Sequence, residues 1–194
     1  MTPMMARLTA AVAATAFLAV APASGQEIYP SRTIKIIAPF PAGAPVDSVA
    51  RLIADRLERA WGQPVVVENR GGGGGIVGTN AVAKAAPGGY TLLLTSTSPI
   101  AAAPALNKTM PYDAVKDLAP IWAISASGLV VVVNPALPIK TLLDLVRLGR
   151  EQPGKLSFAS SGHGTSQHLA GELFMARTGA KLVHVPYRGG LWWC

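Results

Sequence analysis

The sequence predicts an α/β fold built around a largely parallel β-sheet. Short runs of β-branched residues alternate along the chain with amphipathic or Ala-rich segments, which is the pattern of repeated β-α-β units. Half of the 194 residues are apolar and only 14% are charged, so the chain can bury a sizeable core. Its one cysteine, Cys194, excludes a disulfide framework and a cysteine-based zinc site within a single chain.

The first residues have the composition of a secretory signal peptide. Arg7 precedes an apolar run from Leu8 to Ala21, and small residues suited to cleavage follow this run. The run is shorter than the roughly 20 apolar residues of a transmembrane helix. We therefore expect residues 1–25 to be a signal peptide and the mature chain to be periplasmic.

Six strands are predicted from short apolar runs that carry β-branched residues. In chain order these are TIKIIAPF (33–40), PVVVEN (64–69), YTLLLTS (90–96), LVVVVN (129–134), KLSFAS (155–160) and KLVHVPY (181–187).

Four helices are predicted between these strands. The first is amphipathic, with Asp47 as its N-cap and Gly62 after its last turn. The second is Ala-rich and covers residues 76–86. The third starts at Thr141, which forms an approximate capping box with Asp144, and ends before Pro153. The fourth covers residues 165–177 and is closed by Gly179.

A Pro- and Ala-rich passage between the third and fourth predicted strands indicates a domain boundary. This passage differs from the regular units on either side, and we place the boundary near residue 124. The predicted organisation is a signal peptide (1–25), a first α/β domain (26–124) and a second α/β domain (125–194).

The glycine run ENRGGGGGIVG after the second strand raises the possibility of a nucleotide site. Gly73, Gly75 and Gly78 match the G-x-G-x-x-G spacing of a dinucleotide-binding loop. No acidic residue follows between Glu68 and Asp113 to hold a ribose hydroxyl, and an exported protein meets little free NAD. We favour a tight strand-to-helix turn in which glycines adopt positive φ, and we expect no cofactor.

Two other loops have the chemistry of anion sites. APFPAGAPVD (38–47) follows the first strand and leads into a helix N-terminus, whose N–H groups favour negative charge. ASSGHGTSQHLAGE (159–172) repeats this design after the fifth strand and adds hydroxyl donors, and TSTS (95–98) follows the third strand. We expect the three loops to meet at one crevice.

Histidines near the second of these loops raise two further hypotheses. A Ser/His hydrolase would pair Ser160 or Ser161 with His163 or His168, but the G-x-S-x-G pattern is absent. A metal site is not favoured, because His163 and His168 are five positions apart and His184 lies in a strand without a nearby acid. We expect neither catalytic residues nor metal ligands.

Several motifs in order resemble the Bug (TctC) family of extracytoplasmic solute receptors, the substrate-binding components of tripartite tricarboxylate transporters. These include IIAPFPAGAPVDSVARLIADRLE, PVVVENRGGGGGIVG, FASSGHGTSQHLAGELF and HVPYRGG, and the resemblance covers nearly all of residues 27–190. The Lys and Arg residues are scattered and no aromatic residues interleave with them, so we expect no nucleic-acid partner. The resemblance implies a periplasmic-binding-protein-like, Venus-flytrap fold of two domains and a monomer. It also implies a small carboxylate ligand and two membrane subunits as partners.

The resemblance implies a set of ligand-binding positions on the three loops. They are Phe40, Ala42, Gly43, Ala44 and Asp47, then Ser96 and Thr97, then Ser160, Ser161, Gly162 and Thr165, with Tyr187 and Arg188 at the rim.

Two departures from the family pattern bear on these positions. The family usually has two adjacent glycines in the first loop, whereas here the second is Ala44, followed by Pro45. A positive φ at Ala44 would strain the site, and a methyl group facing the ligand would narrow it. The chain also stops at LWWC where the family continues, so we expect a C-terminally truncated chain with an incomplete second domain.

The preferred function is therefore a solute receptor and not an enzyme. The alternatives are an exported Ser/His hydrolase, a nucleotide-dependent enzyme, or an inactive fragment of the receptor.

Overall fold

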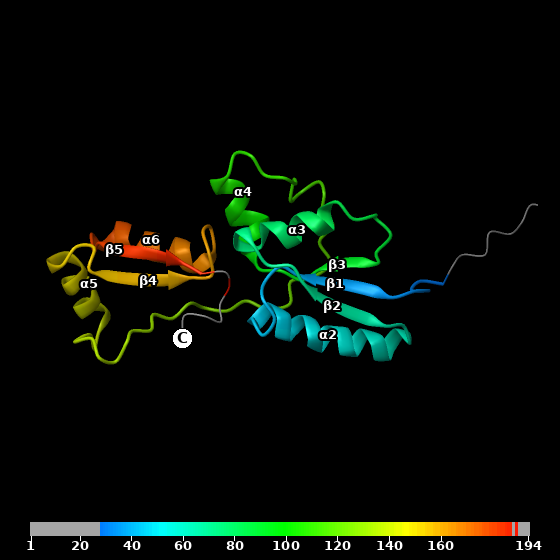
Figure 1. Cartoon of the computed structure of the whole chain (residues 1–194), viewed down its shortest axis with the longest axis horizontal. Helices are drawn as coiled ribbons and strands as arrows, with labels where there is room; N and C mark the ends of the chain where they lie inside the picture. The colour runs from blue at the N-terminus through cyan, green and yellow to red at the C-terminus, as the bar shows by residue number, and fades with distance from the viewer. Residues whose placement is uncertain (1–27, 188, 190–194) are drawn as a thin grey trace, which may run out of the picture. The chain divides into compact units, whose positions relative to one another are not determined.

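The computed structural model describes residues 28–187 and residue 189. It divides the chain into two compact units, Met1–Ser31 and Arg32–Cys194. The predicted signal peptide, residues 1–25, and Arg188 lie outside the described residues. Every helix and strand below belongs to the second unit (Figure 1). None of the described helices has both the length and the apolar character to cross a membrane.

A three-stranded parallel sheet forms around β1 (Ile34–Ala38). It pairs with β2 (Val65–Asn69) on one side and β3 (Thr91–Leu93) on the other, in the order β2-β1-β3. Ile34 faces Val65 across the first pair, and Lys35 faces Thr91 across the second. The central position of β1 explains why four of its five residues are buried. The predicted parallel sheet and its first three strands are confirmed.

Two helices cover this sheet. α2 (Pro45–Trp61) packs on β1 and β2, and its Ala50 and Ala54 join Ile34, Ile36, Ala38 and Val65 in the core. α3 (Ile76–Ala83) contacts β1 and β3 and lies on the other face in Figure 1. The turn before α3 is the short 3₁₀ helix η2 (Gly73–Gly75). A π-helical turn η3 (Ser98–Ala102) and α4 (Ala103–Leu106) follow β3.

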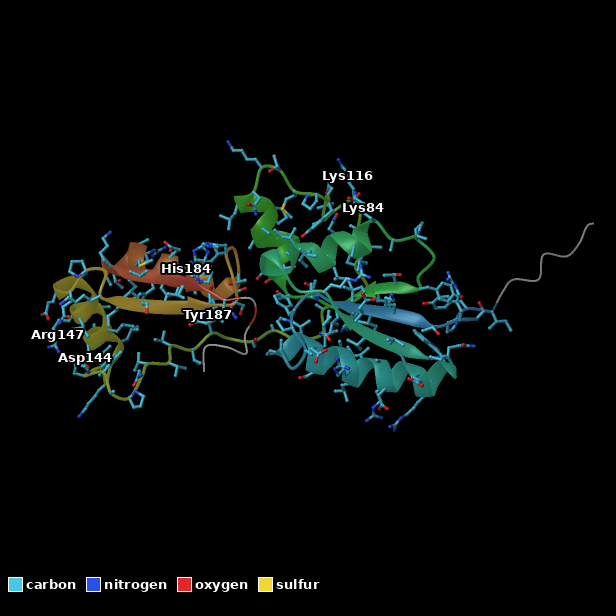
Figure 2. The ribbon with its side chains drawn as sticks, in the orientation of Figure 1. Lys84, Lys116, Asp144, Arg147, His184 and Tyr187 are labelled. Atoms are coloured by element: carbon cyan, nitrogen blue, oxygen red, sulfur yellow. The ribbon has the colours of Figure 1, made fainter. Side chains whose placement is uncertain are left out.

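The second half of the described chain contains a two-stranded parallel sheet. β4 (Leu156–Ser160) pairs with β5 (Leu182–Pro186), and α5 (Leu142–Glu151) and α6 (Ser166–Thr178) precede these strands. Thr141 and Asp144 form the predicted capping box of α5, and Gly179 ends α6 in the left-handed conformation as predicted. Asp144 also pairs with Arg147 at 3.2 Å on the exposed face of α5 (Figure 2).

Two local predictions are wrong. The run 129–134 is irregular and exposed instead of forming a strand. A strand needs a neighbour for its backbone hydrogen bonds, and no described strand pairs with this run. The N-cap of α2 is Ala44 and not Asp47, because Pro45 begins the helix at its first position.

Candidate functional site

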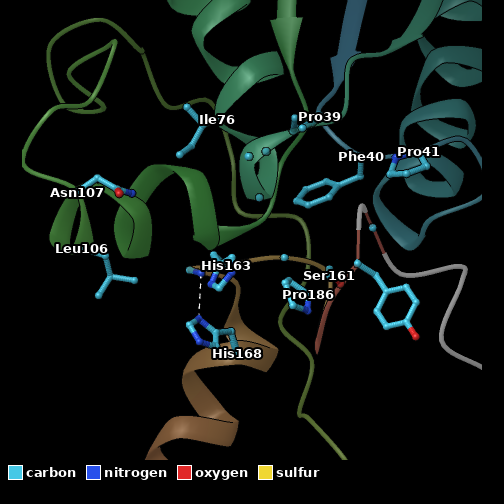
Figure 3. Close-up of a pocket in the computed structure, with 18 residues that line it drawn as sticks. Pro39, Phe40, Pro41, Ile76, Leu106, Asn107, Ser161, His163, His168 and Pro186 are labelled. Atoms are coloured by element: carbon cyan, nitrogen blue, oxygen red, sulfur yellow. Dashed lines mark hydrogen bonds between the residues drawn. The ribbon is translucent and has the colours of Figure 1, made fainter. Parts of the chain in front are cut away.

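A cavity of about 560 Å³ lies at the carboxyl ends of β1, β2, β4 and β5 (Figure 3). Ligands of parallel α/β sheets bind beyond this edge of the strands. The residues that border the cavity come from the loops after these four strands, from the end of β5, and from α3, α4 and α6 with the residue that follows α4. They are Pro39, Phe40, Pro41, Gly72, Gly73, Gly74, Gly75, Ile76, Leu106, Asn107, Ser161, Gly162, His163, Gly164, His168, Pro186, Tyr187 and Gly189.

The glycine run forms one wall of this cavity. Gly72 to Gly75 all have positive φ, which L-residues with side chains rarely adopt. A Cβ atom on Gly74 would lie 2.8 Å from the carbonyl oxygen of His163, so this backbone approaches the loop after β4 closely. The predicted tight turn is confirmed, but the sequence analysis did not place this run in the site.

A polar network around the buried Asp47 carboxylate holds the loop after β1. The Asp47 carboxylate accepts hydrogen bonds from Gly43 N at 2.7 Å, Asn69 Nδ2 at 2.8 Å and Arg51 Nε at 3.0 Å. Asn69 Nδ2 also donates to the carbonyl oxygen of Phe40 at 3.1 Å. The network therefore ties the end of β2 to the cavity loop and to the start of α2.

The environment of Asp47 determines its protonation. Its side chain is almost fully buried, and burial alone would raise the pKa of the carboxyl. The hydrogen bonds from Arg51, from Gly43 and from Asn69, together with the charge of Arg51, outweigh burial and hold the pKa below its usual value. Asp47 is thus an ionised structural group and does not border the cavity.

The remaining predicted residues of the first loop are arranged around this network. Phe40 borders the cavity, whereas Ala42, Gly43 and Ala44 do not. The Gly43 N–H donates its hydrogen bond to the Asp47 carboxylate. Ala44 is buried with φ of −65°, so the expected backbone strain at this position is absent. Positive φ falls on Gly43 instead.

The predicted residues of the loop after β4 fall into two groups. Some border the cavity, and the others form hydrogen bonds within the loop. Ser161 and Gly162 border the cavity. Ser160 and Thr165 are almost fully buried, and both hydroxyls contact the carbonyl oxygen of Gly162, at 3.1 and 2.8 Å. They shape the loop from within and do not present donors to the cavity.

The predicted positions outside these loops also divide. Ser96 and Thr97 do not border the cavity, and the neighbouring Ser98 instead accepts a hydrogen bond from Ser166 N at 3.2 Å. This bond occupies the first N–H of α6, which the sequence analysis expected to be available to an anion. Tyr187 borders the cavity.

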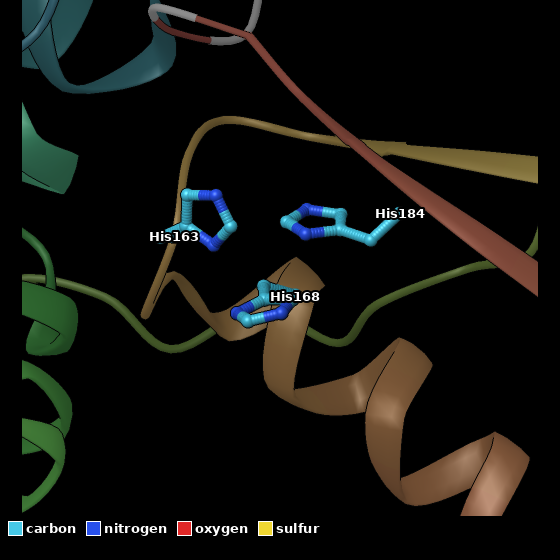
Figure 4. Close-up of side chains that lie close together, drawn as sticks. All are labelled: His163, His168 and His184. Carbon is cyan, nitrogen blue, oxygen red and sulfur yellow. The ribbon is translucent and has the colours of Figure 1, made fainter.

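Three histidines converge beside the cavity (Figure 4). The His168 and His184 rings stack with centroids 4.0 Å apart, and His163 meets them edge-on at 5.3 and 5.0 Å. The five-residue spacing that was used against a metal site is not the relevant geometry, because His163 lies in the loop before α6 and only His168 lies on the helix. α6 packs on β4 and β5, and this packing brings the loop, helix and strand histidines together.

The lining of the cavity combines polar and apolar groups. None of the described lining residues carries an acidic side chain, while Asn107, Ser161, His163, His168 and Tyr187 provide polar groups. Phe40, Ile76 and Leu106 provide apolar surface, and the glycine wall exposes backbone in place of side chains. Sequence reasoning missed Asn69, Arg51, Leu106 and Asn107. For Asn69, its place at the end of a strand was an available signal.

Comparison with known proteins gives a consistent result. Residues 49–191 match the family model described as tripartite tricarboxylate transporter family receptor. Protein BugT of Bordetella pertussis is 44% identical over 189 residues, which are 95% of this chain and 57% of BugT.

Two of the similar solved structures have names that state a ligand. Rpa4515 of R. palustris with adipate is 34% identical, with a TM-score of 0.79 over 83% of this chain and 54% of that one. MatC of Rhodopseudomonas palustris with bound malate is 28% identical, with a TM-score of 0.69 over 83% of this chain and 55% of that one. The chain therefore spans about half the length of the proteins it matches.

Proposed function

Because the chain belongs to the tripartite tricarboxylate transporter receptor family, we propose that it is an extracytoplasmic receptor for a small carboxylate. The observation that carries this proposal is the acid-free cavity at the carboxyl ends of four parallel strands. Anions avoid the repulsion of buried carboxylates there, and the related proteins solved with adipate and malate bind dicarboxylates.

The proposed partners and location follow from the same membership. The receptor would act in the periplasm and deliver its ligand to the membrane subunits of a tripartite transporter. We propose that it acts as a monomer with a first α/β domain ending near residue 124. Its basic residues are scattered along the sequence, which supports the absence of a nucleic-acid site.

The hydrolase alternative is disfavoured by the position of its nucleophile. Ser160 Oγ lies 2.6 Å from His184 Nε2, so a Ser/His pair does exist. However, Ser160 is completely buried and its hydroxyl is also held by both backbone groups of Gly162. A nucleophile must reach the scissile carbonyl, and this hydroxyl has no exposed surface from which to do so.

Titration calorimetry with adipate and malate tests the proposal, with adipamide as a neutral control of the same length as adipate. We expect heat from a dicarboxylate and none from adipamide. Equal binding of adipamide, or no binding by a chain whose circular dichroism shows it to be folded, would overturn the proposal.

A matched pair of substitutions at Leu106 locates the ligand. This side chain borders the cavity but is 54% exposed, so polar replacements should not disrupt folding. Leu106→Asp places a negative charge in the wall, and Leu106→Asn has nearly the same shape without the charge. Repulsion of about 1 kcal/mol predicts roughly fivefold weaker dicarboxylate binding for the Asp variant than for the Asn variant.

A further inference from the structure

We propose that His163, His168 and His184 form a binding site for a divalent transition-metal ion such as Zn²⁺, Ni²⁺ or Cu²⁺. One ring nitrogen from each lies within 4.8 Å of the others, and imidazole is a preferred ligand of these metals. They are all the histidines of the chain, and they come from three different segments. This inference does not rest on the proposed receptor function.

The hydrogen bonds of His184 leave one nitrogen available to a metal. Its Nε2 lies 2.6 Å from Ser160 Oγ, and Ser160 Oγ also lies 3.1 Å from the carbonyl oxygen of Gly162. If the serine donates its proton to that carbonyl, Nε2–H must donate to the serine and Nδ1 keeps its lone pair. Metal-bound histidines are usually oriented by such a donation to an oxygen.

His168 has the same arrangement. Its Nδ1 accepts a hydrogen bond from Gly164 N at 3.1 Å, so Nδ1 carries the lone pair. Its Nε2 lies 3.6 Å from Glu172 Oε1, where a carboxylate can orient the ring. A metal at Nδ1 would replace the hydrogen bond from Gly164 N.

The orientation of the three imidazole rings determines which ring must turn before a metal ion can bind to all three. The His168 and His184 planes are 16° apart with ring centroids 4.0 Å apart, so their nitrogen lone pairs lie in two separate, nearly parallel planes. One of these rings must turn for both to meet a single ion. His163 is exposed and lies nearly perpendicular to both rings, so it can complete the set without disturbing the core.

Calorimetric titration of the untagged full chain with Zn²⁺ tests the site. A Cys194→Ser background removes the only thiol, which would otherwise compete for the metal. We expect one ion per chain and at least tenfold weaker binding in each of His163→Ala, His168→Ala and His184→Gln. Gln167→Ala is the matched control, because Gln167 lies on α6 beside His168 and outside the cluster.

A spectroscopic measurement keeps the proposal testable if a variant fails to fold. Electron paramagnetic resonance of the Cu²⁺-loaded unsubstituted chain should show hyperfine splitting from imidazole nitrogens. Oxygen-only coordination, no stoichiometric binding, or Zn²⁺ affinity unchanged in both His163→Ala and His168→Ala would overturn the proposal. Because the titrations use metal without any carboxylate, their failure is separate from a failure of the receptor function.

Discussion

Asp47 is a buried carboxylate whose partners come from three parts of the chain. Gly43 precedes it in the cavity loop, Arg51 lies one turn later in α2, and Asn69 ends β2. Each partner donates a hydrogen bond to a charged acceptor, and such bonds are stronger than neutral ones. The position of Phe40 at the cavity therefore depends on a residue that does not border the cavity.

The stability contributed by Asp47 should depend on pH. Because its pKa is lower in the folded state than the value of about 3.9 in unfolded chains, its contribution is complete above about pH 4 and is lost as pH falls through the folded pKa. We expect Asp47→Asn to lower the free energy of unfolding by about 2 kcal/mol at pH 7. Urea denaturation of both proteins between pH 2.5 and pH 7 measures this difference. A difference that stays constant over that range would contradict the assignment.

At the scale of elements, Gly78 allows α3 to pack closely against Pro39 and Arg70, although its own φ is not positive. A Cβ atom on Gly78 would lie 2.6 Å from the carbonyl oxygen of Arg70 and 2.7 Å from Pro39 Cβ. Alanine is normally the better helix former, so any loss on substitution must come from packing against these atoms.

Gly78→Ala should therefore lower the free energy of unfolding by about 1–3 kcal/mol. Gly128→Ala is the matched control, because no atom lies within 4 Å of its added Cβ. Thermal or urea denaturation should separate the two variants. If Gly78→Ala is as stable as the control, the close approach of α3 to Pro39 is not needed.

The run 129–134 should promote aggregation. Val130, Val131 and Val132 are 85%, 65% and 82% exposed, and uncharged β-branched runs readily pair with other chains. Val131→Lys should slow the growth of light scattering at high protein concentration without lowering the free energy of unfolding.

The control for that prediction is Val115→Lys, which adds the same charge to a valine that is 89% exposed but outside the run. If both variants slow aggregation equally, net charge and not the valine run is responsible.

Sequence patterns predicted the elements whose evidence is local. The capping box of α5, the glycine that ends α6 and the β-branched strands β1 and β2 each depend on neighbouring residues. Residues 129–134 have the same local pattern as a strand, but pairing depends on a distant partner. The histidine cluster and the Asp47–Asn69 contact likewise could not be predicted from local sequence patterns, because the packing of separate elements creates them.

At the scale of the whole described chain, several contacts join the three-stranded and two-stranded parts. Ser166 N donates to Ser98 Oγ, and the glycine wall approaches the carbonyl oxygen of His163. These contacts close the cavity between loops that are far apart in sequence.

Gly74→Ala should weaken this contact and dicarboxylate binding together. Gly62→Ala is the control, since Gly62 has φ of 65° against 66° for Gly74 but has no atom within 4 Å of an added Cβ. Both variants incur about 1–2 kcal/mol of backbone strain. Any further loss of stability or of dicarboxylate affinity in Gly74→Ala therefore measures the contact between Gly74 and the carbonyl oxygen of His163. Calorimetry and denaturation of the two variants measure it. Equal losses would mean that the contact contributes nothing.

Burial is distributed unevenly over the chain. Four of the five β1 residues are buried, whereas α6 has no buried residue and α5 has only Leu145 and Gly149. Segments with few buried contacts open locally at a lower free energy than the core does. Amide hydrogens of β4 and β5 should therefore exchange with deuterated water through partial openings, while those of β1 should exchange only when the whole chain unfolds.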